Sequence, residues 1–397
     1  MSERTGVLFV GALGAVATTT IAGLIAVNQK LAPLRGLIST EPVFVSLDLV
    51  PLRNLVFGGW DIRKALVSSS VLDHDIVPEN IRQKICGELD QIEVWPAPLT
   101  NVGDYVRNVY GVHGTSPSLI EAVELIKQHI EHFKRRHGID RVVVINTAST
   151  EENTDSSPIY ESLTAFEKAM RSNSSEIRPG MLYAYAALQS GCAYVNFTPS
   201  VTVEIPALQE LAEMKSVPFS GKDGRTGQTL YKHVLGKMFK VRGMKVTGWY
   251  STNILGNEDG AVLDYPAYRE TKIESKERGL EGILGYSDFD HRVRIDYFPI
   301  RRDRKEAWDA IDFEGWLGVQ MSMKINWLGS DSILAAPLIV DLVRFMDHAL
   351  RQGKSGAMTH LSLFFKSPYA VEEYALDEQY RYILEYAKAE ASLKLSR

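Results

Sequence analysis

Short apolar runs alternate with helical periodicity through the first 200 residues of the chain. Val7 to Val10 is predicted to be a buried strand, Gly11 to Gly14 a turn, and Ala15 to Asn28 a helix whose small residues let it pack closely on a sheet. Glycines and threonines interrupt this charge-free stretch, unlike the denser leucine, isoleucine and valine pattern of a membrane span. Strands that alternate with helices in this way predict an α/β fold with a Rossmann-like, doubly wound parallel sheet.

The same alternation continues along the rest of this region. A helix over Ser118 to Arg136 carries apolar residues at three- and four-residue spacing, and it is predicted to end at Gly138. Further strands are predicted at Gly36 to Ser39, Val142 to Ile145 and Ala193 to Phe197, and further helices at Tyr160 to Ser172 and Gly180 to Ser190.

The middle of the chain has a different pattern. Lys245 to Tyr250 and His291 to Tyr297 alternate apolar with polar residues, as the half-buried strands of an antiparallel sheet do. Beyond them, Asp331 begins an apolar helix that is predicted to return to the core of the first domain. The expected domains are a Rossmann-like domain at 1–200, an α+β domain at 201–330, and a C-terminal segment at 331–397 that returns to the first domain.

The composition narrows the classes of function. The chain has 397 residues, 45% of them hydrophobic, so it can bury a core larger than that of one typical domain. A net charge of -5 leaves no positive excess for a nucleic-acid backbone or an anionic membrane surface, which favours a small molecule as the partner. Cys86 and Cys192 form neither a disulfide framework nor a zinc-ligand spacing, and we expect a reducing, cytoplasmic environment.

The turn that begins at Gly11 is the first candidate for chemistry. Gly11 and Gly14 would let backbone N–H groups approach a pyrophosphate at the positive end of the following helix. The spacing departs from that of the common dinucleotide fingerprint, and Ala17 stands where a third glycine is expected. A purely structural turn is the alternative. Glu41 and Asp61, the acids that would bind the ribose hydroxyls, both lie later than the usual distance of about 20 residues.

A second candidate is the loop from Gly221 to Thr229, which combines three glycines, two cations and two hydroxyl side chains before a predicted helix. Successive N–H groups at the helix start, together with Thr226 and Gln228, would cradle a phosphate monoester. The loop lacks the Gly-Lys-Ser/Thr sequence of an ATPase loop. An ordinary surface loop is the alternative interpretation.

Four lysines are candidates for acid–base or charge-stabilising roles. Lys272 and Lys276 lie one helical turn apart, and their mutual repulsion would lower a lysine pKa toward useful values. Lys305 lies in a charged run, whose simpler interpretation is a solvated face. Lys366 follows the apolar residues Leu363 to Phe365, which predicts a strand that delivers a cation to a buried place.

Two histidines, His129 and His132, have metal-like spacing on the predicted helix at Ser118 to Arg136. They lie among charged residues, so an exposed helix face is the favoured interpretation. The sequence contains neither the nucleophile elbow of hydrolases nor the helical zinc motif of metalloproteases.

Eight stretches, in order along nearly the whole chain, resemble the inositol-phosphate synthase family and most closely its shorter archaeal and bacterial type. They are Phe57 to Ile62, Asn146 to Glu151, Tyr194 to Pro199, Asp223 to Thr229, Tyr250 to Gly260, Lys272 to Lys276, Asp331 to Leu338 and Phe364 to Pro368. The resemblance implies an NAD-dependent enzyme whose α+β domain carries catalysis and assembly into a homotetramer.

The resemblance also implies a role for each matching residue. NAD would be bound by Gly11, Gly14, Ala15, Asp61, Thr147, Ala148 and Thr150. The substrate phosphate would be held by Thr226, Gly227 and Gln228. The active-site lysines would be Lys272, Lys276, Lys305 and Lys366, with Asp223, Asn257, Asp259 and Asp331 as polar residues near nicotinamide and substrate. Gly224 and Arg225 stand where many relatives have a lysine, and the glycine-rich turn is the looser version found in this family.

The implied reaction begins with oxidation of open-chain glucose 6-phosphate at C5 by NAD, which acidifies the C6 protons. An enolate then attacks C1, and the hydride returns to the C5 ketone, so the net change is an isomerisation to 1L-myo-inositol 1-phosphate. Asp223, Asp259 and Asp331 could help to position a divalent metal or an ammonium ion. Two alternatives are a net dehydrogenase of a sugar phosphate or cyclitol and a nucleotide-binding protein without chemistry. The four lysines argue against the second.

Overall fold

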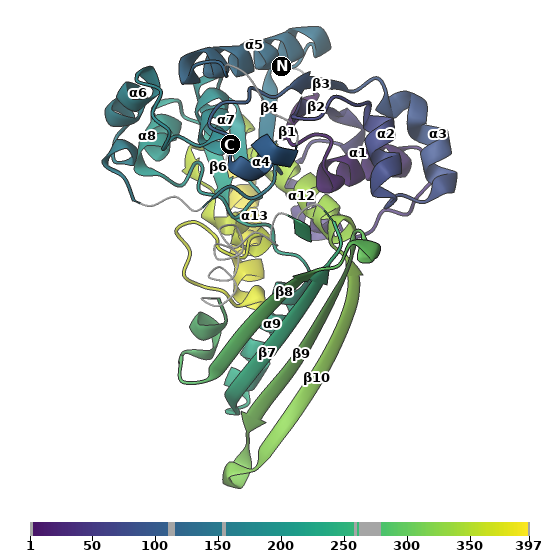
Figure 1. Ribbon diagram of the computed structural model, residues 1–397, viewed down its shortest axis with the longest axis vertical. Coiled ribbons are helices and arrows are strands. Elements are labelled where there is room, and N and C mark those ends of the chain that lie inside the picture. Colours follow the sequence, from purple (N-terminus) through teal and green to yellow (C-terminus); the bar gives the residue numbers. More distant parts are fainter. Residues whose placement is uncertain (1–2, 110–115, 153–155, 258–259, 262–278, 396–397) are drawn as a thin grey trace.

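Two β-sheets organise the molecule, one in the upper half of Figure 1 and one in the lower half. The computed structural model describes residues 3–109, 116–152, 156–257, 260–261 and 279–395. The first sheet has the strand order β11-β6-β5-β4-β1-β2-β3, and its paired strands are all parallel. Its strands are β1 (Thr5–Val10), β2 (Leu55–Asp61), β3 (Glu93–Pro96), β4 (Arg141–Asn146), β5 (Ala193–Asn196), β6 (Pro218–Gly221) and β11 (Gly356–Ala357). The predicted doubly wound parallel sheet is thus confirmed.

Helices pack on both faces of this sheet. The helices are α1 (Ala15–Asn28), α2 (Val67–His74), α3 (Glu79–Leu89), α4 (Asp104–Val109), α5 (Leu119–His137), α6 (Leu163–Arg171), α7 (Pro179–Gln189), α8 (Pro206–Met214), α12 (Asp331–Arg351) and α13 (Leu376–Leu395). Short 3-10 helices lie at Ile38–Thr40, Pro42–Leu47, Leu52–Asn54, Pro158–Tyr160, Pro299–Arg301, Trp316–Gly318 and Thr359–Phe364. Among the described residues, no helix has both the length and the apolar content that crossing a bilayer requires.

The central strand β1 explains why both faces need helices. Val7 and Phe9 point into a core that α1 and α12 share, whereas Leu8 and Val10 point into a second core that α5 and α7 share. Every residue of β1 is buried, as expected for a strand with period-two side chains and a covered sheet on both faces.

The helix that begins at Asp331 packs in the first core. The carboxylate of Asp341 accepts the N–H groups of Ile38 and Ser39, each at 3.0 Å. Farther along α12, the fully buried Asp347 accepts the hydroxyl of Thr5 at 2.7 Å and pairs with Arg141 at 2.7 Å. Polar anchors therefore fix α12 against strands that lie at the start of the sequence.

One local prediction is wrong. Gly36 to Ser39 does not form a strand, because Ile38 and Ser39 donate their N–H groups to Asp341 instead of to a strand ladder, and a 3-10 helix begins at Ile38. The second strand in sequence is β2, whose adjacent Gly58 and Gly59 conceal the strand pattern. In addition, β6 belongs to the first sheet, although its residues fall within the range 201–330 that the sequence assigned to the second domain.

The second sheet is mixed, with the strand order β10-β9-β7-β8. Its strands are β7 (Lys245–Leu255), β8 (Asp290–Tyr297), β9 (Arg304–Glu314) and β10 (Gln320–Ser330), and α9 (Gly227–Val241) packs on one face. The prediction of an antiparallel sheet is wrong for β7 and β8, which pair in parallel. The connection over 256–289 is longer than the dozen or so residues that a parallel crossover needs. The small core beneath α9 centres on Phe239, Trp249 and Ile311.

Candidate active site

The turn after β1 has the geometry of a dinucleotide-binding turn. The N–H groups of Gly11 and Ala12 both donate to the carbonyl of Trp60 at 2.9 Å, which joins the ends of β1 and β2. Gly11 takes a φ of +84°, and a Cβ there would come within 3.1 Å of Ala148 Cα. Within the described residues, no side chain caps the N-terminus of α1. Its first N–H groups are therefore available to a pyrophosphate.

Asp61 lies at the carboxyl end of β2, where the ribose of a dinucleotide binds in sheets of this type. Its side chain is 5% exposed, accepts the Leu13 N–H at 2.8 Å and pairs with Arg63 at 3.3 Å. Nε2 of His74 lies 2.8 Å from the carbonyl oxygen of the same residue, Leu13. Asp61 and His74 therefore hold the turn from both sides. Sequence reasoning missed Arg63 and His74, because neither belongs to a motif.

The end of β4 forms the third side of this site. Thr147 donates its hydroxyl to the carbonyl of Val10 at 3.0 Å, and the Ala148 N–H donates to Asn146 Oδ1 at 3.1 Å. The residues predicted for the cofactor lie together along one cavity at the carboxyl edge of the sheet. That cavity is lined by Gly11, Gly14, Asp61, Thr147, Ala148 and Thr150, and Ala15 lines the adjoining one.

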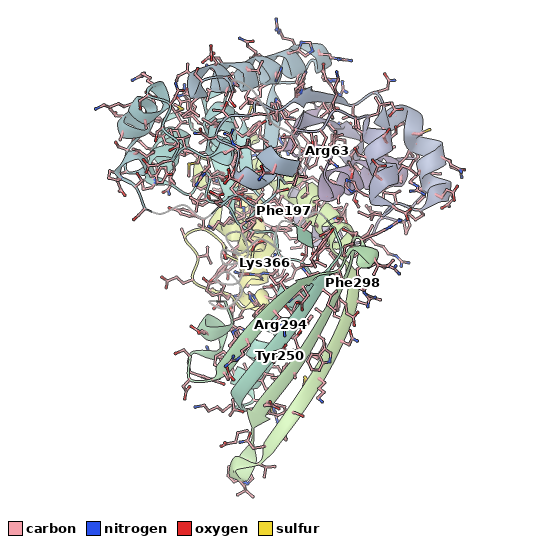
Figure 2. The ribbon with its side chains drawn as sticks, in the orientation of Figure 1. Arg63, Phe197, Tyr250, Arg294, Phe298 and Lys366 are labelled. Atoms are coloured by element: carbon pink, nitrogen blue, oxygen red, sulfur yellow. The ribbon has the colours of Figure 1, made fainter. Side chains whose placement is uncertain are left out.

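The first lysine–aspartate pair joins the loop between β6 and α9, which carries Asp223, to Lys366, which follows the 3-10 helix at Thr359–Phe364. Lys366 Nζ is 2.9 Å from Asp223 Oδ1, and both side chains are nearly buried. The backbone reinforces the pair, because the Lys366 N–H donates to the Asp223 carbonyl at 2.7 Å. Figure 2 shows Lys366 below Phe197, where the two sheets meet. The strand predicted before Lys366 is wrong: a 3-10 helix precedes it, and only Phe365 bridges to Gly224.

The second pair lies where the N-termini of α9 and α12 converge. Lys305 Nζ is 2.8 Å from Asp331 Oδ2, and the Thr226 hydroxyl donates to Asp331 Oδ1 at 3.3 Å. Lys305 is 6% exposed, so the interpretation of a solvated face is wrong for this residue. Gly227 begins α9 with a φ of +55°, and a Cβ there would lie 3.3 Å from Asp331 Oδ1. Among the described residues, no side-chain hydrogen bond caps the N-terminus of α9. The arrangement therefore gathers one cation and uncapped helix N–H groups, which suits a phosphate.

Gln228 has a different environment from Thr226. Its side chain points into the core beneath α9, where Nε2 donates to Asp309 at 2.7 Å and Oε1 accepts from Asn253 at 2.7 Å. Any contact between Gln228 and a phosphate in this structure would therefore come from its backbone N–H.

Asp303 is a buried carboxyl that sequence reasoning missed within the charged run at 301–306. It accepts the hydroxyls of Ser330 and Ser332, the two residues on either side of Asp331. Burial raises the pKa of Asp303 above its ordinary value. By holding both neighbours, Asp303 fixes the position of Asp331, which in turn holds Lys305.

A single cavity joins the two halves of the site. It is lined by Gly14, Ala15, Thr147, Ala148, Thr150, Asp223, Thr226, Asn257, Asp331 and Lys366, among others. The predicted cofactor residues and several predicted catalytic residues thus face one space. Lys272, Lys276 and Asp259 lie outside the described residues.

Arg225, at the departure from the family pattern, does not line this cavity. Its guanidinium nitrogens are buried and have no hydrogen-bond partner among the residues described. Burial lowers the pKa of Arg225 to about 9. Burial and the nearby positive charge of Arg225 lower the pKa of His233 well below its ordinary value.

The histidines of α5 have structural partners. Trp60 Nε1 donates to His129 Nδ1 at 3.0 Å, the ring of His129 stacks on Trp95, and His132 lies 3.5 Å from Glu93. The part of the chain that the structure describes contains no cluster of three or more His, Cys, Asp or Glu residues suited to a metal ion.

Comparison with known proteins gives one consistent result. A family profile described as myo-inositol-1-phosphate synthase matches residues 5–387. Inositol-3-phosphate synthase 1 of Bacteroides thetaiotaomicron is 43% identical, over 92% of this chain and 89% of that protein. Inositol-3-phosphate synthase 1-A of Xenopus laevis is 31% identical over 76% of this chain, which spans 56% of the frog protein. The crystal structure of inositol-3-phosphate synthase from Caenorhabditis elegans shares the fold, with a TM-score of 0.90 at 24% identity over 98% of this chain and 86% of that one.

Proposed function

The chain belongs to the myo-inositol-1-phosphate synthase family, and from this premise we propose the part that its side chains take in the reaction. The enzyme converts glucose 6-phosphate to an inositol phosphate with NAD. The observation that carries the proposal is the shared cavity, in which the dinucleotide turn at Gly14 and the Lys366–Asp223 pair face one space. A cofactor and a sugar phosphate could meet there.

NAD fits the groups at the carboxyl edge of the first sheet. The uncapped N–H groups of α1 suit the pyrophosphate of NAD, and Asp61 suits its ribose. Gly11 has no side chain to fill the narrow space beside Ala148. When bound, NAD supplies a hydride acceptor that oxidises C5 and later returns the hydride. In our proposal Gly14, Ala15, Thr147, Ala148 and Thr150 complete its site.

The phosphate of the substrate is proposed to bind at the N-terminus of α9. The N–H groups of Gly227 and Gln228 and the hydroxyl of Thr226 would donate to it, and Lys305 would supply a charge. Asp331 would keep Lys305 in place while the substrate binds, because the two side chains are already paired at 2.8 Å.

Lys366 is proposed to stabilise the oxyanion at C5 and to take part in proton transfer, together with Lys272. A buried ammonium beside Asp223 is preorganised for this role, because it needs no reorientation as charge develops on the substrate. Lys276 and Lys305 would act near C1 or the phosphate, and Asn257 and Asp259 would contact the nicotinamide or the substrate.

An assisting ion is a separate part of the proposal. Asp223, Asp259 and Asp331 are the carboxylates that would help to hold a divalent metal or an ammonium ion. Asp223 and Asp331 each contact a lysine already, so a monovalent ion of low charge suits them better than a divalent metal. Activity that survives dialysis against a chelator and responds to ammonium would support this choice.

We propose the wider setting as follows. The thiols of Cys86 and Cys192 are free, which suits a reducing cytoplasm. For the domains we propose the division into 1–200, 201–330 and 331–397, with the first part extended to include β6, which pairs in the first sheet. A homotetramer built through the second sheet completes the proposal.

The experiment that tests the function is incubation of the purified protein with NAD and glucose 6-phosphate. Phosphorus and carbon NMR would resolve the products while absorbance reports NADH. Inositol monophosphate without accumulating NADH is the expected result. Net NADH with a keto sugar phosphate would favour the dehydrogenase.

The same assay tests the role of Lys366. Lys366→Ala should lower kcat by about 100- to 1000-fold, as loss of one transition-state donor typically does. Lys354→Ala is the control, because Lys354 pairs with Glu390 away from the cavity. Near-normal turnover of the Lys366 variant would refute the assignment.

A further inference from the structure

Asp309 is a carboxylate in the middle of β9, and it is fully buried beneath α9. Four side chains donate to it. Its Oδ1 accepts the indole N–H of Trp249 at 2.7 Å and the hydroxyl of Ser251 at 2.6 Å. Its Oδ2 accepts the amide of Gln228 at 2.7 Å and the hydroxyl of Tyr231. A buried carboxylate needs such donors to offset the hydration that it has lost. The four donors tie the side chain of Asp309, on β9, to β7 and α9.

The contact with Gln228 links this anion to the proposed phosphate site. Gln228 lies in the first turn of α9, and its amide is used at both ends, because Asn253 donates to Oε1 at 2.7 Å. Gln228 cannot turn without breaking two buried hydrogen bonds. The N–H groups of Gly227 and Gln228 therefore have a fixed direction before any ligand binds.

We infer that Asp309 is a positioning residue for phosphate binding, which acts by fixing the first turn of α9 through Gln228. The inference rests on the proposed function, since it assigns the phosphate to this helix terminus. Asp309 does not touch the substrate. Its oxygens lie on the sheet side of α9, and it does not line the cavity that holds Lys366.

The test compares variants in the full-length enzyme with inorganic phosphate as the probe. Asp309→Asn keeps the shape of the side chain and removes its charge. The two donors that then face the NH2 group lose their acceptor. The inhibition constant for phosphate and the KM for glucose 6-phosphate should both rise by about tenfold or more, the scale of one hydrogen bond to a charged group. The KM for NAD should stay within about twofold, because the α1 terminus is unaffected.

Two further variants separate positioning from general stability. Ser251→Ala removes a donor from Oδ1 of the same carboxylate and leaves the Gln228 contact intact, so phosphate inhibition should be unchanged. Asn253→Ala removes the other bond to the Gln228 amide and should weaken phosphate binding, which provides the test should Asp309→Asn not fold. Asp309→Asn combined with Gln228→Met should bind phosphate no more weakly than Gln228→Met alone, because both act through one contact.

Unchanged phosphate inhibition in both Asp309→Asn and Asn253→Ala would overturn the inference, and so would an equal loss in Ser251→Ala. A wild-type protein that makes no inositol phosphate from glucose 6-phosphate would instead overturn the proposed function, so the two failures are distinguishable.

Discussion

Two buried ion pairs of lysine and aspartate have the main roles in the proposed chemistry. Lys366 with Asp223 and Lys305 with Asp331 are both removed from solvent for most of their surface. A buried ion pair adds little net stability, because desolvation offsets most of its attraction. Their value lies in preorganisation: each carboxylate holds an ammonium in place before the substrate develops charge.

Glu151 shows the opposite situation, a buried carboxyl with too few partners. Its Oε1 accepts the Gly180 N–H at 2.8 Å, whereas Oε2 is buried and has no hydrogen bond to any described residue. Burial raises the pKa of Glu151 to about 7, against the opposing effects of Gly180 and Arg178. The fold therefore favours the protonated form.

This pKa predicts how stability depends on pH. Because the folded pKa of about 7 lies above the ordinary 4.5, the contribution of Glu151 is fully present below pH 4.5 and is lost as pH rises through 7. Glu151→Gln should remove that loss. Its free energy of unfolding, relative to that of the wild type, should therefore rise by about 2–3 kcal/mol between pH 4.5 and pH 8. Urea unfolding at the two pH values measures the difference. Glu152→Gln is the control and should keep the wild-type dependence; equal curves for all three proteins would contradict the prediction.

Helix termini are the elements that bring the site together. The N-termini of α1, α9 and α12 all meet the shared cavity or its lining residues, and each offers backbone N–H groups or a carboxylate. Negative groups of the cofactor and the substrate bind best at such ends. The position of these helices, more than any single side chain, places the two proposed phosphate sites in one space.

The first residue of α9 gives the second prediction. Gly227→Ala introduces a Cβ at a φ of +55°, 3.3 Å from Asp331 Oδ1. We expect a loss of about 1 kcal/mol in unfolding free energy from the backbone and about a tenfold rise in the KM for glucose 6-phosphate. Gly243→Ala is matched, because its φ is +62° and its Cβ would meet nothing within 4 Å. Gly243→Ala should lose a similar free energy of unfolding but should leave the KM for glucose 6-phosphate unchanged. A similar KM for both variants would rule out the proposed phosphate site.

Elements with strong local signals could be predicted from the sequence. The predicted helix Ala15 to Asn28 matches α1, and α5 ends at the predicted stop, Gly138. Strands β2 and β9 were missed, because β2 contains two adjacent glycines and β9 has charged residues, Lys305 and Asp309, at positions of its buried face. The parallel pairing of β7 with β8 depends on a long crossover, which local patterns do not encode.

The site was partly predictable for a related reason. The cofactor turn and the loop at Asp223 carry compact motifs, so their residues could be named before the fold was known. His74, Asp303 and Asp309 act through contacts with residues far away in sequence, and isolated acids or histidines give no such signal.

At the scale of the whole molecule, the second sheet extends away from the first as a long curved blade (Figure 1). On one of its faces, α9 and the segment at 279–289 pack around Phe239 and Trp249. On the other face, Tyr250 and the 38% exposed Trp308 form an edge-on aromatic pair. Figure 2 shows Tyr250 and Arg294 on this blade, well below the junction at Lys366.

The proposed homotetramer gives the third prediction. Trp308→Glu places a charge on the open face of the blade, so the mass measured by light scattering should fall from that of a tetramer to a smaller species. Val45→Glu, at a residue 75% exposed in the first part of the chain, is the control and should leave the mass unchanged. A wild-type monomer, or a tetramer that tolerates Trp308→Glu, would exclude assembly through this face.

The anchoring of α12 on β1 also has a consequence for biosynthesis. Thr5 and Asp347, which share a hydrogen bond, are 342 residues apart in sequence. At ribosomal rates of about 5–20 residues per second, β1 waits roughly 20–70 seconds for the helix that covers it. During that interval the apolar face formed by Val7 and Phe9 lacks the part of its native cover that α12 supplies. We therefore expect a chaperone to matter more for the nascent chain than for the folded enzyme.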